Sequence, residues 1–396
     1  MSRVIFVYER DMPTVSIMRD IFTCAFSKKE VKISFKFLLN ITTMDIDNND
    51  VLVLIRPNDT LSSDIAKKAK RSGCTVVAYF DDDLLNHRPV GPWRLKGIKS
   101  VLTNSDVIWS SNRYICERYK KYTTTDRAAV TDTIVDESKL EDISSFVETE
   151  CCGQVRIVYA ANPTHVAQFN RYILPIMPRL AERYGKKLEM TFVCVKPELS
   201  KYEDRIKIRH VVGMPLHEYR RFMKEQRFDI GLSPLQNNEF TKCKYFNKYI
   251  EYTLSGIAGV YSRVEPYTDV IKDRENGFLA YNTEESWYQT ICEAIDDETL
   301  RKSCVRAARG HLLNDFSQEK IVDRLLKDIP ELISVKADRH SCETFTTAKI
   351  CYILFRLFDW LYLSFYFLTK TGIRGFIDKA KTHIRERKAY RKKGDI

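Results

Sequence analysis

Short apolar segments alternate with helical patterns throughout this chain, and this alternation limits the fold more than any other feature. In the first 150 residues each apolar segment is short enough for a strand and is followed by a helical stretch or a turn. Consecutive strands joined through helices pair in parallel and need helices on both faces of the sheet. The predicted strands here are 4–8, 32–38, 51–55, 75–80 and 106–110, with helices over 14–25, 62–72 and 113–122.

The same alternation restarts near residue 154, which predicts a second doubly wound α/β domain. We therefore expect an N-terminal domain over 1–150, a second domain over 151–335 and an appendage over 336–396. Ligands of open parallel sheets bind beyond the carboxyl ends of the strands, so two such domains should enclose a cleft. The predicted strands are 155–160, 188–195, 206–212, 229–233 and 257–261, with helices over 166–184, 216–225, 284–296, 300–314 and 318–329.

Charge and cysteine content exclude several classes of protein. The net charge is +11, but 370–396 holds ten Lys/Arg against three Asp/Glu, a net +7. This uneven charge argues against a nucleic-acid partner for the whole chain. Eleven cysteines without a CxxC pair, and a start that leads directly into a strand, favour a reducing cytoplasm without a signal peptide. No Cys/His spacing suggests zinc, so we expect no metal site.

A group of charged residues follows the 229–233 strand. Lys244, Lys248 and Glu251 would share one face of a helix, which should end at Ser255-Gly256 before the next strand. Two ammonium groups and a carboxylate suit a ligand that carries both phosphate and hydroxyls, such as a nucleotide-sugar.

The order K-x-x-x-K-x-x-E-Y-x-x-x-G-I from Lys244, with an N-G-F-L turn after it, resembles the donor-binding half of the retaining group 1 glycosyltransferases. This resemblance implies the GT-B fold, a nucleotide-sugar co-substrate and no required cofactor. It implies that Glu251 binds the ribose hydroxyls and that Lys244 and Lys248 neutralise the leaving diphosphate. The alternatives are a surface ion pair and a solvated basic face. The further donor-binding candidates that it implies are Asn238, Phe240, Tyr252, Pro266 and Tyr267.

The chain departs from the family at two positions that bear on the sugar. Cys243 stands where many members have a glutamate that contacts the donor sugar, and Tyr245 stands where a serine is usual. Near 160–165, His165 or Arg171 could replace the family's basic pair, although a helix start capped by Thr164 is the other reading. These differences leave the identity of the sugar open.

Three adjacent acids follow the strand 75–80, where the resemblance implies an acceptor-side acid. We expect Asp82 to be catalytic and Asp81 and Asp83 to lie on the acceptor side; the alternative is a helix N-cap with first-turn acids. Arg19 is a further acceptor-side candidate, with an ordinary surface arginine as its alternative.

The segment 350–369 is apolar and aromatic but contains Arg356 and Asp359. At helical spacing, positions 349, 352, 356, 359, 363, 366 and 370 form one mostly polar stripe, which predicts an amphipathic helix in the plane of a membrane. With the basic end, 350–396 would bind an anionic membrane surface. A membrane span, or a helix packed on the protein's own core with a solvated basic end, are the alternatives.

Together these observations predict a retaining glycosyltransferase, peripheral on the inner face of the cell membrane. It would move a sugar from a nucleotide-sugar to a hydroxyl of a lipid-linked or cell-envelope saccharide. The alternatives are a GT-B sugar-nucleotide epimerase and a non-enzymatic polyanion- or lipid-binding protein.

Overall fold

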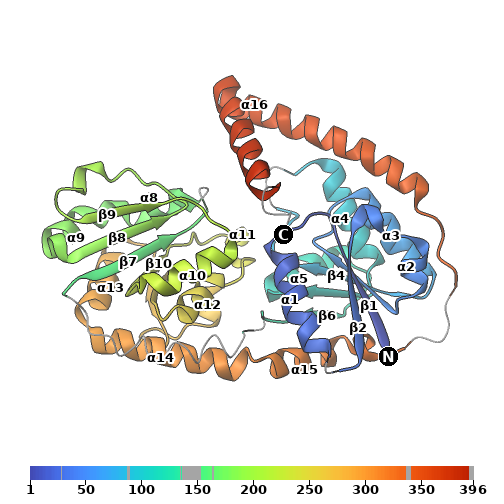
Figure 1. Ribbon diagram of the computed structural model, residues 1–396, viewed down its shortest axis with the longest axis horizontal. Coiled ribbons are helices and arrows are strands. Elements are labelled where there is room, and N and C mark those ends of the chain that lie inside the picture. Colours follow the sequence, from blue (N-terminus) through green and yellow to red (C-terminus); the bar gives the residue numbers. More distant parts are fainter. Residues whose placement is uncertain are drawn as a thin grey trace.

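Two six-stranded parallel sheets form the two halves of the molecule and lie side by side in the computed structural model (Figure 1). The structure describes residues 1–27, 29–86, 90–133, 135, 153–162, 165–335 and 340–391. The expected seam between the domains, near 137–153, therefore lies almost wholly outside the described residues.

The first sheet confirms the strands predicted for the N-terminal half. Its strand order is β2-β1-β3-β4-β5-β6, and every pair is parallel. The strands are β1 (Ser2–Tyr8), β2 (Val31–Phe37), β3 (Val51–Ile55), β4 (Thr75–Phe80), β5 (Val107–Ser110) and β6 (Ala128–Val130), and the helices are α1 (Pro13–Ser27), α2 (Thr43–Asp47), α3 (Thr60–Arg71), α4 (Pro92–Asn104) and α5 (Arg113–Tyr119).

Helices cover both faces of this sheet because its strands are apolar on both sides. In β3, Leu52 and Leu54 join one core cluster, while Val51, Val53 and Ile55 join the cluster on the other face. Side chains of a strand point alternately to opposite faces, so a continuous apolar run is buried only between two helical layers.

The second sheet repeats this construction with the order β12-β11-β10-β7-β8-β9. The predicted helix over 166–184 is interrupted, as its two prolines suggested. Its strands are β7 (Val155–Ala160), β8 (Leu188–Val193), β9 (Lys207–Val211), β10 (Ile230–Ser233), β11 (Ala258–Ser262) and β12 (Phe278–Ala280), and its helices are α8 (Val166–Tyr172), α9 (Met177–Tyr184), α10 (Leu216–Gln226), α11 (Glu239–Lys242), α12 (Asn247–Leu254), α13 (Glu284–Asp296) and α14 (Glu298–Asp315).

The chain crosses back to the first sheet after α14, which Figure 1 shows along one side of the molecule. Helix α15 (Gln318–Asp328) and the short 3-10 turn η8 (Pro330–Ile333) bury Ile321, Leu325 and Leu332 in a core cluster of the first sheet. The end of the predicted second domain, 151–335, thus packs on the first sheet. Sequence pattern locates these elements but does not say which sheet they cover.

The last helix, α16 (Thr346–Arg391), packs on the opposite face of the first sheet, with Tyr352 and Phe355 buried there. Its backbone leaves helical geometry at Gly372, with φ 66° and ψ 178°, a conformation that glycine adopts at low cost. Its 28-residue segment Thr346–Ile373 contains an 18-residue window with mean hydropathy 1.3, and by length and composition it could cross a membrane. The polar stripe predicted to face water instead faces the first domain, through the contacts described below.

Candidate functional site

The carboxyl edges of the two sheets meet at residues 238–245. The side-chain amide of Asn112, just after β5, donates hydrogen bonds to the backbone carbonyls of Lys242 and Lys244, at 2.8 and 2.7 Å. Arg118 of α5 pairs with Glu239 of α11 at 2.9 Å. The donor loop of the second domain is thus held directly against the strand ends of the first.

Helix α12 carries the central ion pair of the site. Lys248 Nζ lies 2.5 Å from Glu251 Oε2, one turn apart on the same face. The hydroxyl of Tyr219, on α10, donates to the same carboxylate oxygen at 3.0 Å and accepts from Lys248 at 3.2 Å. Both charged side chains keep about a quarter of their surface exposed. An incoming ligand can therefore reach this carboxylate and this ammonium group.

Lys244 lies before α12 and not on it, which corrects the prediction of one helical face. The helix begins only at Asn247, and the Lys244 ammonium group sits 5.2 Å from the centre of the Phe240 ring. Lys244 still belongs to the same site, because its ammonium group and that of Lys248 both affect the pKa of His165. Burial, together with these two ammonium groups, lowers the pKa of His165 to about 4. Thr164, which the sequence suggested as the N-cap of the helix that starts here, lies outside the described residues.

Asn238 and Phe240 shape the loop that carries Lys244. The Asn238 side chain caps α11 by accepting a hydrogen bond from the backbone N–H of Thr241 at 2.9 Å. Phe240 provides the ring beside Lys244. These contacts indicate that Asn238 and Phe240 hold the loop that carries Lys244 in place.

Tyr252 and Tyr267 are buried beneath the site. The hydroxyl of Tyr252, whose side chain has no exposed surface, donates to the carbonyl of Leu232 on β10 at 2.8 Å. The Tyr267 hydroxyl lies 2.5 Å from Ser233 Oγ, and Pro266 beside it is buried as well. Their contact with the donor stays a prediction. They attach α12 and the segment after β11 to the sheet.

The acids after β4 are held by partners from neighbouring strand ends. Arg56, which follows β3, pairs with Asp81 and lies 3.3 Å from Asp82. Thr14, at the start of α1, donates to Asp81 at 2.5 Å. Among the described residues the first helix after these acids is α4, which begins at Pro92 with Gly91 as its N-cap, so the acids do not cap it.

Asp83 points to a different partner and is fully buried. Its Oδ2 lies 3.1 Å from Arg118 Nε, while its Oδ1 has no hydrogen-bond partner in the described part of the chain. Beside it is a cavity of about 230 Å³ that is open to solvent. The cavity is lined by Asp83, Leu85, Asn86, Leu95, Lys99, Arg118, Lys121 and Tyr122.

At position 243, where many group 1 members have a glutamate that contacts the donor sugar, this chain has a buried cysteine. Its side chain has no exposed surface and packs in a core cluster of the first sheet. Burial, and the nearby carboxylate of Asp83, raise the pKa of its thiol to about 12. Position 243 therefore joins the two domains, and a charged side chain there would lose its solvation.

Arg19 lies apart from these acids in the contacts described for it. It donates to the Tyr8 hydroxyl at 3.2 Å and lies over the ring of Phe35 on the edge strand β2. Sequence reasoning missed Arg56 and Tyr219. The rule that sites form at strand ends could have found Arg56, which directly follows β3. No local signal connects Tyr219 with a carboxylate 32 residues away.

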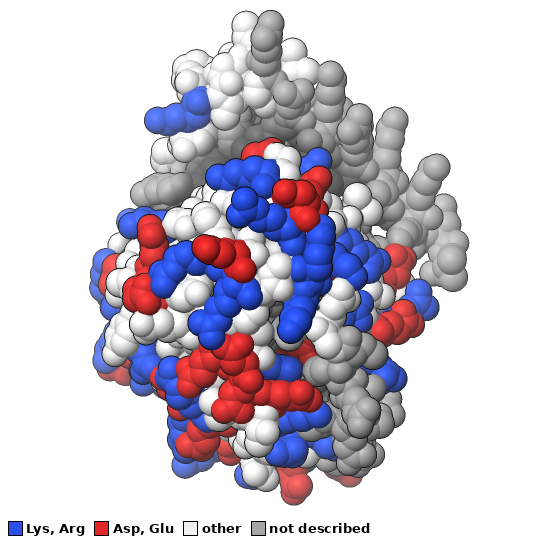
Figure 2. Space-filling model, turned by 90° about the vertical axis from the view of Figure 1, so that its left-hand side faces the viewer, with Lys and Arg blue, Asp and Glu red and all other residues white. Residues whose placement is uncertain are grey.

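Figure 2 shows the face of the second domain that lies away from the first. Among the coloured residues, Lys and Arg side chains are interspersed there with Asp and Glu.

Comparisons with known proteins agree with this architecture. No protein-family model matches the chain, and no curated protein matches it. Among solved structures, the Anabaena protein HepE in complex with UDP matches with a TM-score of 0.60 and 10% identity, over 83% of this chain and 100% of its own. Sucrose-phosphate synthase from Thermosynechococcus elongatus matches with a TM-score of 0.58 and 10% identity, over 84% and 99%. A glycosyltransferase from Rickettsia africae matches with a TM-score of 0.56 and 13% identity, over 85% and 99%. The chain therefore has the GT-B fold that these structures share, as its sequence predicted.

Proposed function

We propose that this protein transfers a sugar from a nucleotide-sugar to a hydroxyl of a saccharide, with retention of configuration. The observation that carries the proposal is the arrangement of Lys248, Glu251 and Tyr219 beside Lys244, at the edge of the second sheet that meets the acids of the first. HepE, with the same fold, was solved with UDP and with UDP-glucose. A UDP-sugar is therefore the donor to test first.

The roles follow from the chemistry of each group. Glu251 exchanges its Lys248 and Tyr219 contacts for the two ribose hydroxyls, since a carboxylate only accepts hydrogen bonds. The released Lys248 ammonium group and that of Lys244 then stabilise the diphosphate as the sugar–phosphate bond breaks. The leaving phosphate oxygen takes the proton of the acceptor hydroxyl on the same face, and Asp82 orients that acceptor.

The cavity beside Asp83 is our candidate for the acceptor. It combines a buried carboxylate, three cationic side chains and the Tyr122 ring, which suits a sugar with hydroxyls and a neighbouring acidic group. This supports a lipid-linked or envelope saccharide as the acceptor, because lipid-linked saccharides carry phosphate close to the sugar.

Donor kinetics of Glu251→Ala test the proposal. Two charge-assisted hydrogen bonds are lost, so the KM for the nucleotide-sugar should rise about a hundredfold. Tyr219→Phe is the matched control: it loses only the internal hydrogen bonds with Glu251 and Lys248, and its KM should change less than threefold. Unchanged donor kinetics in Glu251→Ala would contradict the ribose role. Incubation with donor alone separates transfer from the epimerase alternative, which would isomerise the nucleotide-sugar without an acceptor.

A further inference from the structure

The two faces of α16 have opposite surroundings. Of the 18 large apolar side chains that are exposed among the described residues, 11 lie on this helix between 350 and 377. Phe358, Trp360 and Phe365 expose 58, 62 and 68% of their surface, whereas Tyr352 and Asp359 on the other face expose 3% each. The nine of these 11 side chains that precede the kink at Gly372 form one exposed stripe, and its size indicates a missing apolar partner. The full set is Ile350, Ile353, Leu354, Leu357, Phe358, Trp360, Leu361, Phe365, Leu368, Ile373 and Ile377.

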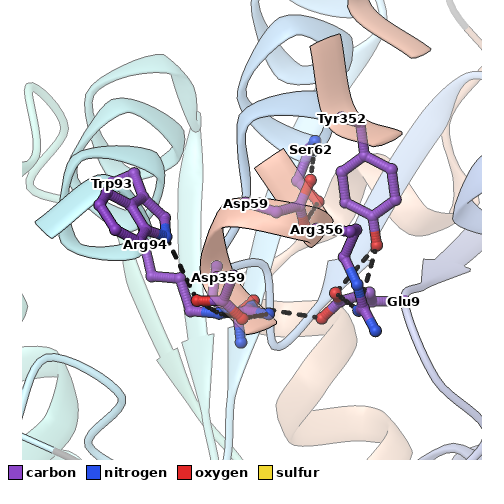
Figure 3. Close-up of polar contacts among 9 residues, drawn as sticks. Glu9, Asp59, Ser62, Trp93, Arg94, Tyr352, Arg356 and Asp359 are labelled. Carbon is purple, nitrogen blue, oxygen red and sulfur yellow. Dashed lines mark hydrogen bonds and ion pairs between the residues drawn. The ribbon is translucent and has the colours of Figure 1, made fainter. Parts of the chain in front are cut away.

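A buried charge cluster holds the other face on the first domain (Figure 3). Asp359 accepts hydrogen bonds from Arg94 at 2.8 and 3.0 Å and from the Trp93 indole at 3.2 Å. Glu9, just after β1, accepts from the Tyr352 hydroxyl at 2.9 Å and pairs with Arg356. Arg94 lies 3.5 Å from Glu9 and thereby joins the two pairs.

This cluster excludes a membrane span for the helix. To cross a membrane, α16 would have to leave the domain, which would bring Arg356 and Asp359 into the apolar layer without their partners. It would also separate Arg94 from Asp359 and Glu9 from Arg356, and the loss of one partner of a buried ion pair is strongly unfavourable. The helix can keep its polar contacts only if it lies flat, with the apolar stripe outward.

The positive charge of the segment after the stripe indicates which apolar partner covers the stripe. The stretch from Lys370 to the end of the chain carries a net +7, and it follows the apolar stripe in the sequence, across the kink at Gly372. A leaflet of anionic lipids offers an apolar layer for the stripe and negative headgroups for this stretch. A second copy of the chain would bring the same positive charge and would repel it.

We infer that α16 is a membrane-docking platform, which lies in the plane of an anionic leaflet with the stripe of Phe358, Trp360 and Phe365 inserted. The cluster of Glu9, Arg94, Arg356 and Asp359 fixes this platform to the first domain. This inference does not depend on sugar transfer, since the docking can be measured without donor or acceptor.

Vesicle flotation of the full chain tests the platform. The protein should float with vesicles of equal parts phosphatidylcholine and phosphatidylglycerol and bind pure phosphatidylcholine at least tenfold more weakly. The double variant Phe358→Ser/Phe365→Ser should lose about a hundredfold in affinity, roughly tenfold for each aromatic side chain. The matched control, Val212→Ser/Tyr281→Ser, removes apolar side chains that are equally exposed elsewhere and should bind normally. Since all four side chains are exposed, the melting temperatures of both variants should remain those of the parent.

Fluorescence quenching determines the depth of Trp360. With lipids brominated at different positions along the chain, a flat helix predicts strongest quenching near the headgroups, after subtraction of the Trp360→Phe spectrum. Strongest quenching at the bilayer centre would overturn the inference in favour of a span. Absent vesicle binding, with a dimer in sedimentation velocity that the Phe358→Ser/Phe365→Ser variant abolishes, would also overturn it.

Discussion

Asp359→Asn tests the cluster that holds α16 on the first domain. The substitution keeps the size of the side chain and one carbonyl oxygen for the Trp93 indole, but it removes the negative charge that faces Arg94. The side chains of Asp359 and Arg94 expose only 4 and 10% of their surface, so solvent cannot replace the lost partner.

The free energy lost in Asp359→Asn depends on the contacts that Arg94 keeps in the variant. Loss of one partner of a buried ion pair costs about 3–5 kcal/mol. Arg94 still contacts Glu9 at 3.5 Å and the side-chain oxygen of Asn58, which places the cost near the lower end, about 3 kcal/mol. This corresponds to roughly a hundredfold increase in the equilibrium constant for detachment of the helix.

Hydrogen exchange of the α16 amides measures this detachment directly, and the amides of α10 on the second domain serve as an internal control. Protection of 350–368 should fall about a hundredfold in Asp359→Asn while α10 is unchanged. The double variant Arg94→Met/Asp359→Leu should recover most of the protection, since it removes both charges of this pair and Glu9 keeps Arg356 as its partner. Unchanged protection in Asp359→Asn would refute the idea that this cluster holds the helix.

Four further predictions concern the site itself. Arg56→Met should lower the free energy of unfolding of the first domain by about 1–3 kcal/mol, measured by urea denaturation, because it leaves two acids without their partner. Because the pKa of His165 is about 4 in the folded chain and 6.5 in the unfolded chain, its stabilising contribution is complete above pH 6.5 and is lost as the pH falls towards 4; His165→Gln should flatten this part of the profile of melting temperature against pH. Iodoacetamide at mildly alkaline pH should leave the buried Cys243 unmodified and alkylate an exposed cysteine such as Cys194, as peptide mass spectrometry can show. Tyr122→Ala should raise the KM for the acceptor about tenfold and leave the KM for the donor unchanged.

The fold could be predicted because its signals are local. The apolar run of β3 and the helix that follows it specify a parallel sheet without knowledge of any distant residue. The destination of α15 could not be predicted in this way. Its apolar side chains, such as Ile321 and Leu325, require burial, but either sheet could have provided it, and the packing of α1 and β1 selects the first.

The site was predicted in its chemistry and less well in its geometry. The spacing of Lys248 and Glu251 gave their shared face correctly, since both lie within α12. Lys244 was placed on the same helix, but the turn after α11 ends the helical register before it. The same pattern did not show that Tyr252 is buried, where its hydroxyl donates to the Leu232 carbonyl and attaches the helix to β10.

The tail shows how an amphipathic pattern specifies two faces without saying which one points outward. Arg356 and Asp359 were expected in water, yet Glu9 and Arg94, more than 250 residues away in the chain, bind them on the first domain.

Glu9 follows β1 and Asp81 follows β4, and only β3 lies between these strands. Adjacent strands are about 4.8 Å apart, so the anchor of α16 and the acceptor-side acids lie at the same edge of the sheet, roughly 10 Å from each other. If this helix lies in a leaflet, an acceptor attached to lipid reaches the acids without leaving the membrane surface, so the anchor and the acceptor edge work as one unit.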